Sequence, residues 1–223
     1  RLGLVGESGC GKSTLTRTIL GLQSASSGYI KFEGQEVSKY DNSFKKNIQV
    51  VFQDPYGSFN PRQKIGRLIT EPFFTLGRDA PPETEQRIIA QKMLKEVGLS
   101  SESIEKYIHE FSGGQRQRIA IARALVIKPK LIIFDEAVSA LDVSIRSQIL
   151  KLISDLTERY GLSYLFISHD LTVIENITEN CLVMKNGKIV ERGQTKHILR
   201  DPKNEYTLSL INAAPKFPNF LHA

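Results

Sequence analysis

The chain has 223 residues, 40% of them apolar and 24% charged, with a formal net charge of +6 at pH 7. This size and composition predict one globular domain with room for a buried sheet, and they exclude a disordered chain. The sequence offers no run of about 18 apolar residues for a transmembrane helix and no basic stripe interleaved with aromatic residues, so we expect membrane contact only through a partner and no nucleic-acid surface.

The first half of the chain predicts strands, a hairpin and a helix. Residues 1–5 (RLGLV) predict an apolar strand that runs directly into a glycine-rich loop and a helical segment. Residues 28–37 (GYIKFEGQEV) predict a small hairpin, and residues 47–54 (NIQVVFQD) predict a strand. Apolar residues recur at helical spacing in residues 83–97, which predicts a helix ended by Gly98. We expect its buried face to comprise Ile88, Ile89, Met93, Leu94 and Val97.

The second half continues the alternation of strands and helices. Residues 130–136 (KLIIFDE) are a continuous apolar run that ends in two acids, as expected for a fully buried parallel strand. Residues 144–161 predict an amphipathic helix, residues 162–170 a further strand, and residues 181–193 a hairpin with an Asn-Gly turn. Together these elements predict an α/β fold with a mostly parallel sheet and small antiparallel β elements.

A phosphate-binding loop is the first chemical motif. Residues 6–14 (GESGCGKST) match G-x-x-x-x-G-K-[ST] between a predicted strand and a predicted helix, which is the context that this pattern needs. Glycines let phosphate oxygens approach the main chain, and the N-terminal end of the helix favours negative charge. We expect Lys12 to bridge the β- and γ-phosphates, Ser13 to bind Mg²⁺ and Thr14 to lie near the α-phosphate. The other nucleotide-binding candidates are Gly6, Glu7, Ser8, Gly9, Cys10 and Gly11.

Two acids follow the buried strand. An acid at the carboxyl end of a central parallel strand lies beside the neighbouring phosphate loop, so we expect Asp135 to hold Mg²⁺ through water. Glu136 would lie nearer to the γ-phosphate, where a carboxylate polarises water for attack. The alternative is a pair of acids that only caps the strand, and the preceding phosphate loop disfavours it.

The two cysteines, Cys10 and Cys181, lie far apart and lack the spacing of metal ligands. No secretory signal precedes them, so we expect free thiols in a reducing cytosol. Because Cys10 lies within the phosphate loop, we expect a bulky maleimide to reach its thiol when the site is empty.

Several motifs occur in one order along nearly the whole chain: GESGCGKST, VVFQD, FSGGQRQR, LIIFDE, SALD and ISHD. This order resembles the nucleotide-binding domain of ATP-binding-cassette (ABC) ATPases, which are P-loop NTPases. The resemblance implies a single ABC-type ATPase core over residues 1–223, without the family's N-terminal strands and the adenine-stacking aromatic residue that they carry. It also implies a helical sub-lobe over about residues 54–127.

The resemblance implies a role for each motif. Gln53 corresponds to the Q-loop glutamine, which senses Mg²⁺ and the attacking water, and His169 to the switch histidine that contacts the γ-phosphate. Asp142 resembles the acid of the D-loop. The implied catalytic set is Glu136, His169, Gln53 and Lys12, and the implied metal set is Ser13, Gln53 and Asp135. The signature segment is Ser112, Gly113, Gly114 and Gln115.

The signature segment implies a dimer, because in ABC dimers arranged head to tail it closes on the nucleotide held by the partner's P-loop. It begins a predicted helix whose N-terminal amides suit a γ-phosphate. Arginines of this helix either steer phosphate or, as we expect, pack or face solvent: Arg116, Arg118 and Arg123. The chain departs from the family pattern at Phe111, where leucine is usual, and at Ala137, where proline is common. Neither change removes a chemical group.

Two longer stretches narrow the resemblance: VVFQDPYGSFNPR and ILRDPKNEYTLSLINAAP. They resemble ATPase subunits of oligopeptide and dipeptide importers, a class that also handles nickel and microcin-like peptides, and residues 195–223 resemble the C-terminal region of that class. The resemblance implies an ATPase that needs ATP and Mg²⁺ and lies at the cytoplasmic face of the inner membrane. Its implied partners are a second nucleotide-binding domain, permease subunits and, indirectly, a periplasmic solute-binding protein.

Several alternatives stay open at this level. A soluble ABC ATPase of translation or DNA repair would share every motif. The pairing partner could be an identical chain, a different chain or the other half of a tandem protein. The motifs do not identify the transported solute or show whether the chain end is natural.

Overall fold

The structure, a computed structural model, describes residues 1–37 and 42–213. Its centre is a six-stranded sheet with the order β4-β5-β6-β1-β7-β8. The strands are β1 (Leu2–Val5), β4 (Ile48–Phe52), β5 (Leu131–Asp135), β6 (Ser163–Ser168), β7 (Asn180–Lys185) and β8 (Lys188–Gln194). Neighbouring strands are parallel except for the antiparallel pair β7 and β8. This confirms the predicted α/β class with a mostly parallel sheet.

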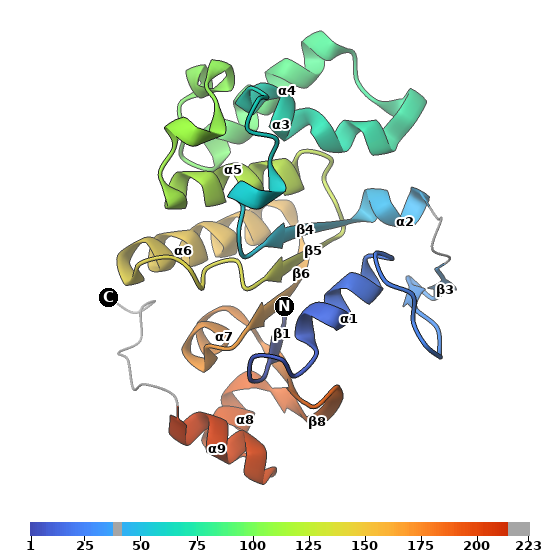
Figure 1. The fold of residues 1–223 in the computed structure, drawn as a ribbon, viewed down its shortest axis with the longest axis vertical. Helices are drawn as coiled ribbons and strands as arrows, with labels where there is room; N and C mark the ends of the chain where they lie inside the picture. Colours follow the sequence, from blue (N-terminus) through green and yellow to red (C-terminus); the bar gives the residue numbers. More distant parts are fainter. Residues whose placement is uncertain (38–41, 214–223) are drawn as a thin grey trace.

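Helices cover both faces of this sheet (Figure 1). The helices of the first half are α1 (Lys12–Ile19), α2 (Asn42–Asn47), α3 (Ile65–Thr70), α4 (Glu83–Glu96) and α5 (Gly113–Leu125). Those of the second half are α6 (Val143–Tyr160), α7 (Leu171–Ile177), α8 (Thr195–Arg200) and α9 (Glu205–Ala213). Short 3-10 segments lie at η1 (Tyr56–Ser58), η2 (Glu71–Asp79), η3 (Ser101–Glu105) and η4 (Ile108–Glu110). None of the helices within the described ranges is long and apolar enough to cross a bilayer.

Alternating side chains of the central strands pack into two separate apolar cores. In β5, Ile132 and Phe134 join the larger core with α5, α6 and α7, whereas Ile133 joins the smaller core beside α1 and α2. This two-residue alternation is the expected geometry of a strand with a helix layer on each face. It explains why residues 131–134 are continuously apolar, because both faces of the strand are buried.

The carboxyl ends of the parallel strands meet at one edge of the sheet. β1 ends there in the phosphate loop, and β5 ends there in Asp135 and Glu136, with β6 between the two strands. Ligand sites of open parallel sheets form at this edge. The strand order therefore brings the phosphate loop and the two acids into one region, as the sequence predicts.

Residues 56–125 consist of helical elements and connecting loops, apart from an isolated bridge between Lys64 and Tyr107. This segment occupies the upper part of Figure 1, and its buried side chains belong to the same apolar core as the adjacent face of the sheet. The limits of a sub-lobe at about residues 54–127 stay a prediction.

The helix predicted over residues 83–97 forms as α4, with one error in its buried face. Met93, Leu94 and Val97 are buried and Ile89 is half-buried, as expected. Ile88 is 65% exposed, so its predicted burial is wrong. Gly98 ends the helix in the left-handed region at φ 75°, where glycine carries no steric penalty.

Both predicted hairpins are present. β2 (Lys31–Phe32) pairs antiparallel with β3 (Gln35–Glu36). The turn between β7 and β8 places Asn186 at φ 47° and Gly187 at φ 76°, the left-handed pair that an Asn-Gly hairpin turn requires. The expected C-terminal segment contributes α8 and α9, and its remainder, residues 214–223, lies outside the described residues.

Candidate nucleotide-binding and hydrolysis site

The phosphate loop, residues 6–14, has a shape that depends on glycine. Gly9 and Gly11 adopt φ values of 81° and 111°, which side chains rarely tolerate. A Cβ atom on Gly6 would lie 2.2 Å from the carbonyl oxygen of Met184 on β7. The loop is also tied to the β7–β8 hairpin, because the Gly187 amide donates to the Cys10 carbonyl at 2.8 Å. The loop therefore packs directly on the C-terminal hairpin.

The ammonium group of Lys12 lies inside this loop. Its ammonium group donates to the carbonyl oxygens of Gly6 at 2.7 Å and Glu7 at 2.9 Å. The residue is only 4% exposed, and its Nζ atom lies 3.9 Å from Oε1 of Glu136. Buried cations are stabilised by such acceptors. The arrangement places positive charge between the loop and the two acids.

Asp135 is buried at the end of β5, with 8% of its surface exposed. Burial raises the pKa of its carboxyl group, and the adjacent Glu136 charge raises it further, whereas a hydrogen bond from Thr16 lowers it. Its Oδ1 atom is buried without a hydrogen-bond partner among the described residues. Buried polar atoms normally have a partner. A hydrated cation at this position would supply one, so Asp135 fits the predicted metal site.

Glu136 has an unusual backbone conformation, and its carboxylate contacts His169. Its φ is 51°, in a region that non-glycine residues rarely occupy, and its amide donates to the Ile167 carbonyl on β6 at 2.9 Å. Its Oε2 atom lies 3.2 Å from Nδ1 of His169. Strained residues of this kind cluster at functional sites. Glu136 therefore contacts His169 and lies beside Lys12, as the predicted catalytic set requires.

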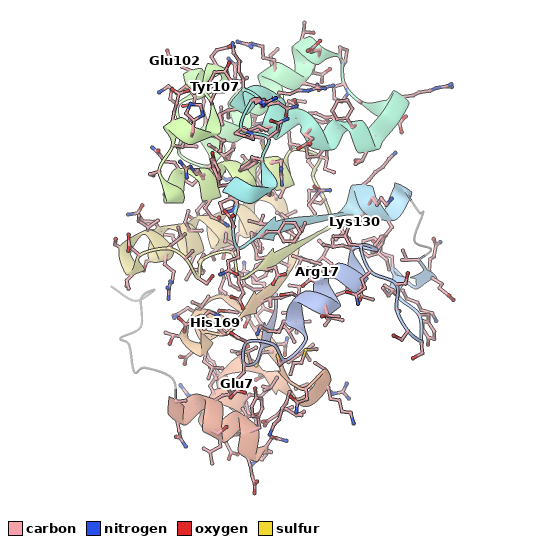
Figure 2. All side chains as sticks on the ribbon, viewed as in Figure 1. Glu7, Arg17, Glu102, Tyr107, Lys130 and His169 are labelled. Atoms are coloured by element: carbon pink, nitrogen blue, oxygen red, sulfur yellow. The ribbon has the colours of Figure 1, made fainter. Side chains whose placement is uncertain are left out.

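A cleft of about 530 Å³ opens beside these groups, and its wall includes Ser13, Gln53, Asp135 and Glu136. The structure thus brings the three predicted metal-site residues and the predicted base to one cavity. Arg17 also lines the cleft, and it was not predicted from the sequence. Arg17 lies four residues after Ser13 on α1, and residues at this spacing share one face of a helix. This spacing could have identified Arg17 as a cleft residue. Figure 2 shows Arg17 on α1, above the region of Glu7 and His169.

No cluster of three or more His, Cys, Asp or Glu side chains suited to a metal ion occurs within residues 1–37 and 42–213. A cation in the cleft would therefore need ligands beyond the protein carboxylates. A hydroxyl from Ser13, water near Asp135 and oxygens of a bound phosphate form the oxygen-rich set that Mg²⁺ prefers.

The signature segment lies away from the phosphate loop of its own chain. Ser112 caps α5: the Gln115 amide donates to its Oγ at 3.4 Å, and the Ser112 amide donates to Oε1 of Gln115 at 3.0 Å. The signature residues neither line the described cleft nor join the described hydrogen bonds of the loop. Asp142 is exposed at the start of α6. Within the described chain, the signature segment and Asp142 therefore do not belong to the cleft beside Glu136.

The three arginines of α5 have partners inside the chain. Arg116 donates to the carbonyls of Ile108 and His109. Arg118 donates to the Val97 carbonyl at 2.8 Å. Arg123 donates to the Ser58 carbonyl at 2.9 Å, and its guanidinium lies over the Phe59 ring. These contacts favour the packing role over phosphate steering.

The two thiols are free, as expected, but Cys10 is not accessible. Cys10 is 6% exposed and contributes to the smaller apolar core, and Cys181 is completely buried. The expected reach of a bulky maleimide to Cys10 is therefore wrong. The Cys10 thiol lies in the smaller core beneath the loop, where its Sγ accepts a weak hydrogen bond from the Lys12 ammonium group at 3.9 Å.

Two adjacent glycines of the signature offer a matched test of packing. A Cβ on Gly114 would lie 2.6 Å from Cγ2 of Ile145 on α6, so Gly114→Ala is expected to cost about 1–3 kcal/mol of stability through overpacking. The nearest atom to a Cβ on Gly113 is 3.9 Å away, so Gly113→Ala should fold with unchanged stability. Denaturant unfolding of both variants measures the difference, and equal destabilisation would contradict the packing of α5 on α6.

The fold and the loop define a class: an α/β protein with a P-loop at the carboxyl edge of a parallel sheet, together with a buried acid and a glutamate–histidine pair. The sequence model of the ABC transporter family matches residues 1–139. The chain belongs to this family.

Relatives and solved structures agree with this assignment. The chain is 47% identical over 219 residues to the dipeptide transport ATP-binding protein DppF of Escherichia coli, covering 96% of this chain and 65% of the relative. It is 47% identical to the oligopeptide transport ATP-binding protein AppF of Bacillus subtilis, covering 96% and 66%. The chain thus spans about two thirds of the length of these relatives.

Two solved structures share the fold. The structure of cbiO1 from Clostridium perfringens, part of the ABC transporter complex cbiONQ, has a TM-score of 0.79 and 29% identity, covering 90% of this chain and 79% of that one. The ATP-binding cassette MJ0796, in a dimeric post-hydrolysis state bound to ADP and Pi, has a TM-score of 0.76 and 27% identity, covering 87% and 84%. The ABC-type P-loop fold is thereby confirmed.

Proposed function

We propose that the chain is the ATP-binding and ATP-hydrolysing subunit of an ABC importer for peptides or related small solutes. The observation that carries the proposal is the meeting of Lys12, Glu136 and His169 beside the cleft that Ser13, Gln53 and Asp135 line. A phosphate loop, an acid for a cation and a base for water are the parts that phosphoryl transfer to water needs.

Binding of ATP rests on the phosphate loop and on the start of α1. The Glu7 and Cys10 amides already donate to the Tyr206 hydroxyl and the Glu7 carbonyl, so the other loop amides and the N-terminal end of α1 are the donors that favour phosphate oxygens. Lys12 adds a positive charge that is already held inside the loop by two carbonyls. Ser13 and Thr14 place hydroxyl groups at the start of the same helix.

The residues that would hold Mg²⁺ are Ser13, Asp135 and Gln53, which share the cleft. The buried and unpaired Oδ1 atom of Asp135 supports this assignment. When bound, Mg²⁺ neutralises charge on phosphate oxygens and orients them. The role of Asp135 is to hold this charge at the end of β5.

Glu136 acts as the general base that accepts a proton from the attacking water. Its Oε2 atom accepts a hydrogen bond of 3.2 Å from Nδ1 of His169, and this bond orients the carboxylate. The second oxygen lies 3.9 Å from the Lys12 ammonium group, so the acid is held between two nitrogen groups. Positioned bases of this kind contribute about 10² to 10⁴ in rate.

The signature segment serves the nucleotide of a second nucleotide-binding domain in a head-to-tail dimer. Among the described residues, the signature neither lines the cleft nor forms backbone hydrogen bonds with the phosphate loop, which supports this proposal. Gly113 has no internal packing reason to be glycine, because a Cβ there would meet no atom closer than 3.9 Å. Close approach of a partner's phosphate supplies that reason. Loss of the γ-phosphate would weaken this contact and let the dimer open.

Transport requires partners in a membrane. We propose permease subunits as direct partners at the cytoplasmic face of the inner membrane, and a periplasmic solute-binding protein as an indirect one. Support comes from the names of the relatives, which are transport proteins for dipeptides and oligopeptides and, at 48% identity over 35% of its length, the glutathione import protein GsiA of Escherichia coli O157:H7. These names disfavour the soluble alternative of translation or DNA repair.

Capture from native membranes tests the transport proposal. We expect the affinity-tagged full-length protein, solubilised in mild detergent, to retain a permease with several transmembrane helices, and we expect a peptide-binding protein to be recovered with it after crosslinking. Mass spectrometry identifies the captured chains, and an untagged strain is the control. Recovery of ribosomes or DNA in place of a permease would contradict the proposal.

A further inference from the structure

The phosphate loop makes one contact that the proposed mechanism does not use. The Glu7 amide donates a hydrogen bond of 3.1 Å to the hydroxyl of Tyr206, a residue of α9 that lies 199 positions later in the chain. Figure 2 shows Glu7 beside the C-terminal helices at the lower end of the molecule. The contact joins the first part of the loop to one of the last described elements.

We propose that Tyr206 is a positioning residue for nucleotide binding, which holds the phosphate loop in its binding conformation through the Glu7 amide. The inference rests on the proposed function, because it assumes that the loop binds a nucleotide. Tyr206 lies outside the residues assigned to phosphate, metal or water, and it acts through the loop backbone alone.

The Glu7 peptide lies at the centre of the loop's own bonding. Its carbonyl accepts hydrogen bonds from the Lys12 ammonium group at 2.9 Å and from the Cys10 amide at 3.2 Å. Its amide is bound by Tyr206 on the other side. Both ends of one peptide unit are therefore held, so Tyr206 restricts the peptide that receives Lys12. Restriction of a loop in its bound conformation improves affinity because less freedom is lost on binding.

Tyr206 is itself held rigidly. It is 7% exposed, and the ammonium group of Lys185 on β7 lies 4.6 Å from its ring centre. The start of α9 is tied to β8, since the Glu191 carboxylate accepts from the Lys203 amide at 2.8 Å and from the Asn204 amide at 3.3 Å. Asn204 in turn accepts the Tyr206 amide through Oδ1 at 2.9 Å. The hydroxyl is thus presented to the loop by a fixed helix start.

Two further contacts beneath the loop come from the same part of the chain. Gly187 donates to the Cys10 carbonyl, and Gly6 packs against the Met184 carbonyl. These contacts join the loop to the β7–β8 hairpin, and Tyr206 joins it to α9. Because the hairpin contacts remain when the hydroxyl is removed, we expect the loop of a Tyr206 variant to loosen without unfolding.

Tyr206→Phe in the full-length protein tests the inference, since it removes the hydroxyl and keeps the ring. We expect the Kd for MgATP, measured by titration calorimetry, to rise about threefold to tenfold, as the loss of one hydrogen bond to a partly buried amide allows. We expect KM to rise by a similar factor with kcat unchanged, because Tyr206 touches neither Glu136 nor His169. Tyr164→Phe is the matched control: it also removes a buried hydroxyl, which donates to the Ile177 carbonyl, but at the start of β6, away from the site edge.

The outcomes separate the inference from the function on which it rests. An unaltered protein that fails to bind MgATP would overturn both. Binding by the unaltered protein with an unchanged Kd in Tyr206→Phe, or an equal rise in Tyr164→Phe, would overturn the inference alone. If Tyr206→Phe fails to fold, hydrogen exchange of the Glu7 amide in the unaltered protein tests the inference instead. We expect this amide to exchange slowly. Exchange at the rate of a free amide would overturn the inference.

Discussion

Replacing Glu136 by glutamine is expected to cut ATP hydrolysis about 100-fold or more, because a positioned general base is typically worth about 10² to 10⁴ in rate. The glutamine keeps the size and hydrogen-bonding shape of the side chain but cannot accept the proton of the attacking water. ATP affinity should stay intact, since Lys12 and the phosphate loop are unchanged. Phosphate release and nucleotide titration measure the two properties separately.

Lys12→Ala is the contrasting variant. It removes the charge that the carbonyls of Gly6 and Glu7 hold inside the loop, so nucleotide binding itself should weaken. The two variants therefore differ in which step fails. An equal loss of ATP binding in Glu136→Gln and Lys12→Ala would contradict this division of roles.

Mixing two inactive variants is expected to restore part of the hydrolysis. The first variant, Lys12→Ala, keeps an intact signature segment, and the second, Ser112→Arg, keeps an intact phosphate loop. In a mixed dimer one site combines both defects, whereas the other combines the sound loop of the second chain with the sound signature of the first. The recovered rate, measured against the mixing ratio, reports this composite site.

The physical reason is the separation seen within one chain. Ser112 caps α5 and does not line the cleft beside Glu136, so we expect the signature to contact the nucleotide of the partner chain. If the signature acted within its own chain, every site in the mixture would keep one defect and no rate would return. Crosslinking in MgATP must show that mixed dimers form. Formed dimers without recovery would contradict the composite site.

Much of the fold follows from local sequence pattern. The continuous apolar run at residues 131–134, the glycines of the phosphate loop and the Asn-Gly turn each specify their own backbone, because period, steric freedom and positive φ are properties of a few neighbouring residues. The same local logic placed Asp135 and Glu136 at the end of a strand. Parallel topology then predicts that they lie near the loop, and the strand order confirms it.

Errors and omissions arose where distant elements meet. Periodicity assigned Ile88 to the buried face of α4, yet none of the described elements buries it and it is 65% exposed. Position in the loop made Cys10 look accessible, but β7 packs beneath the loop and turns the side chain into the smaller core. Arg17 was overlooked because its place on the cleft wall depends on how α1 faces β5.

By itself, the sequence determined the phosphate loop, the two acids, the alternation of strands and helices and the family resemblance, since each depends on residue type at short spacing. Only the tertiary structure decided which side chains meet across the sheet edge. It brought Glu136 to His169, which lies 33 residues further along the chain, and Glu7 to Tyr206, 199 residues away. Contacts between residues so far apart in the chain depend on the strand order and on the packing of α9 beneath the loop. The spacing of apolar residues along the sequence specifies neither of these.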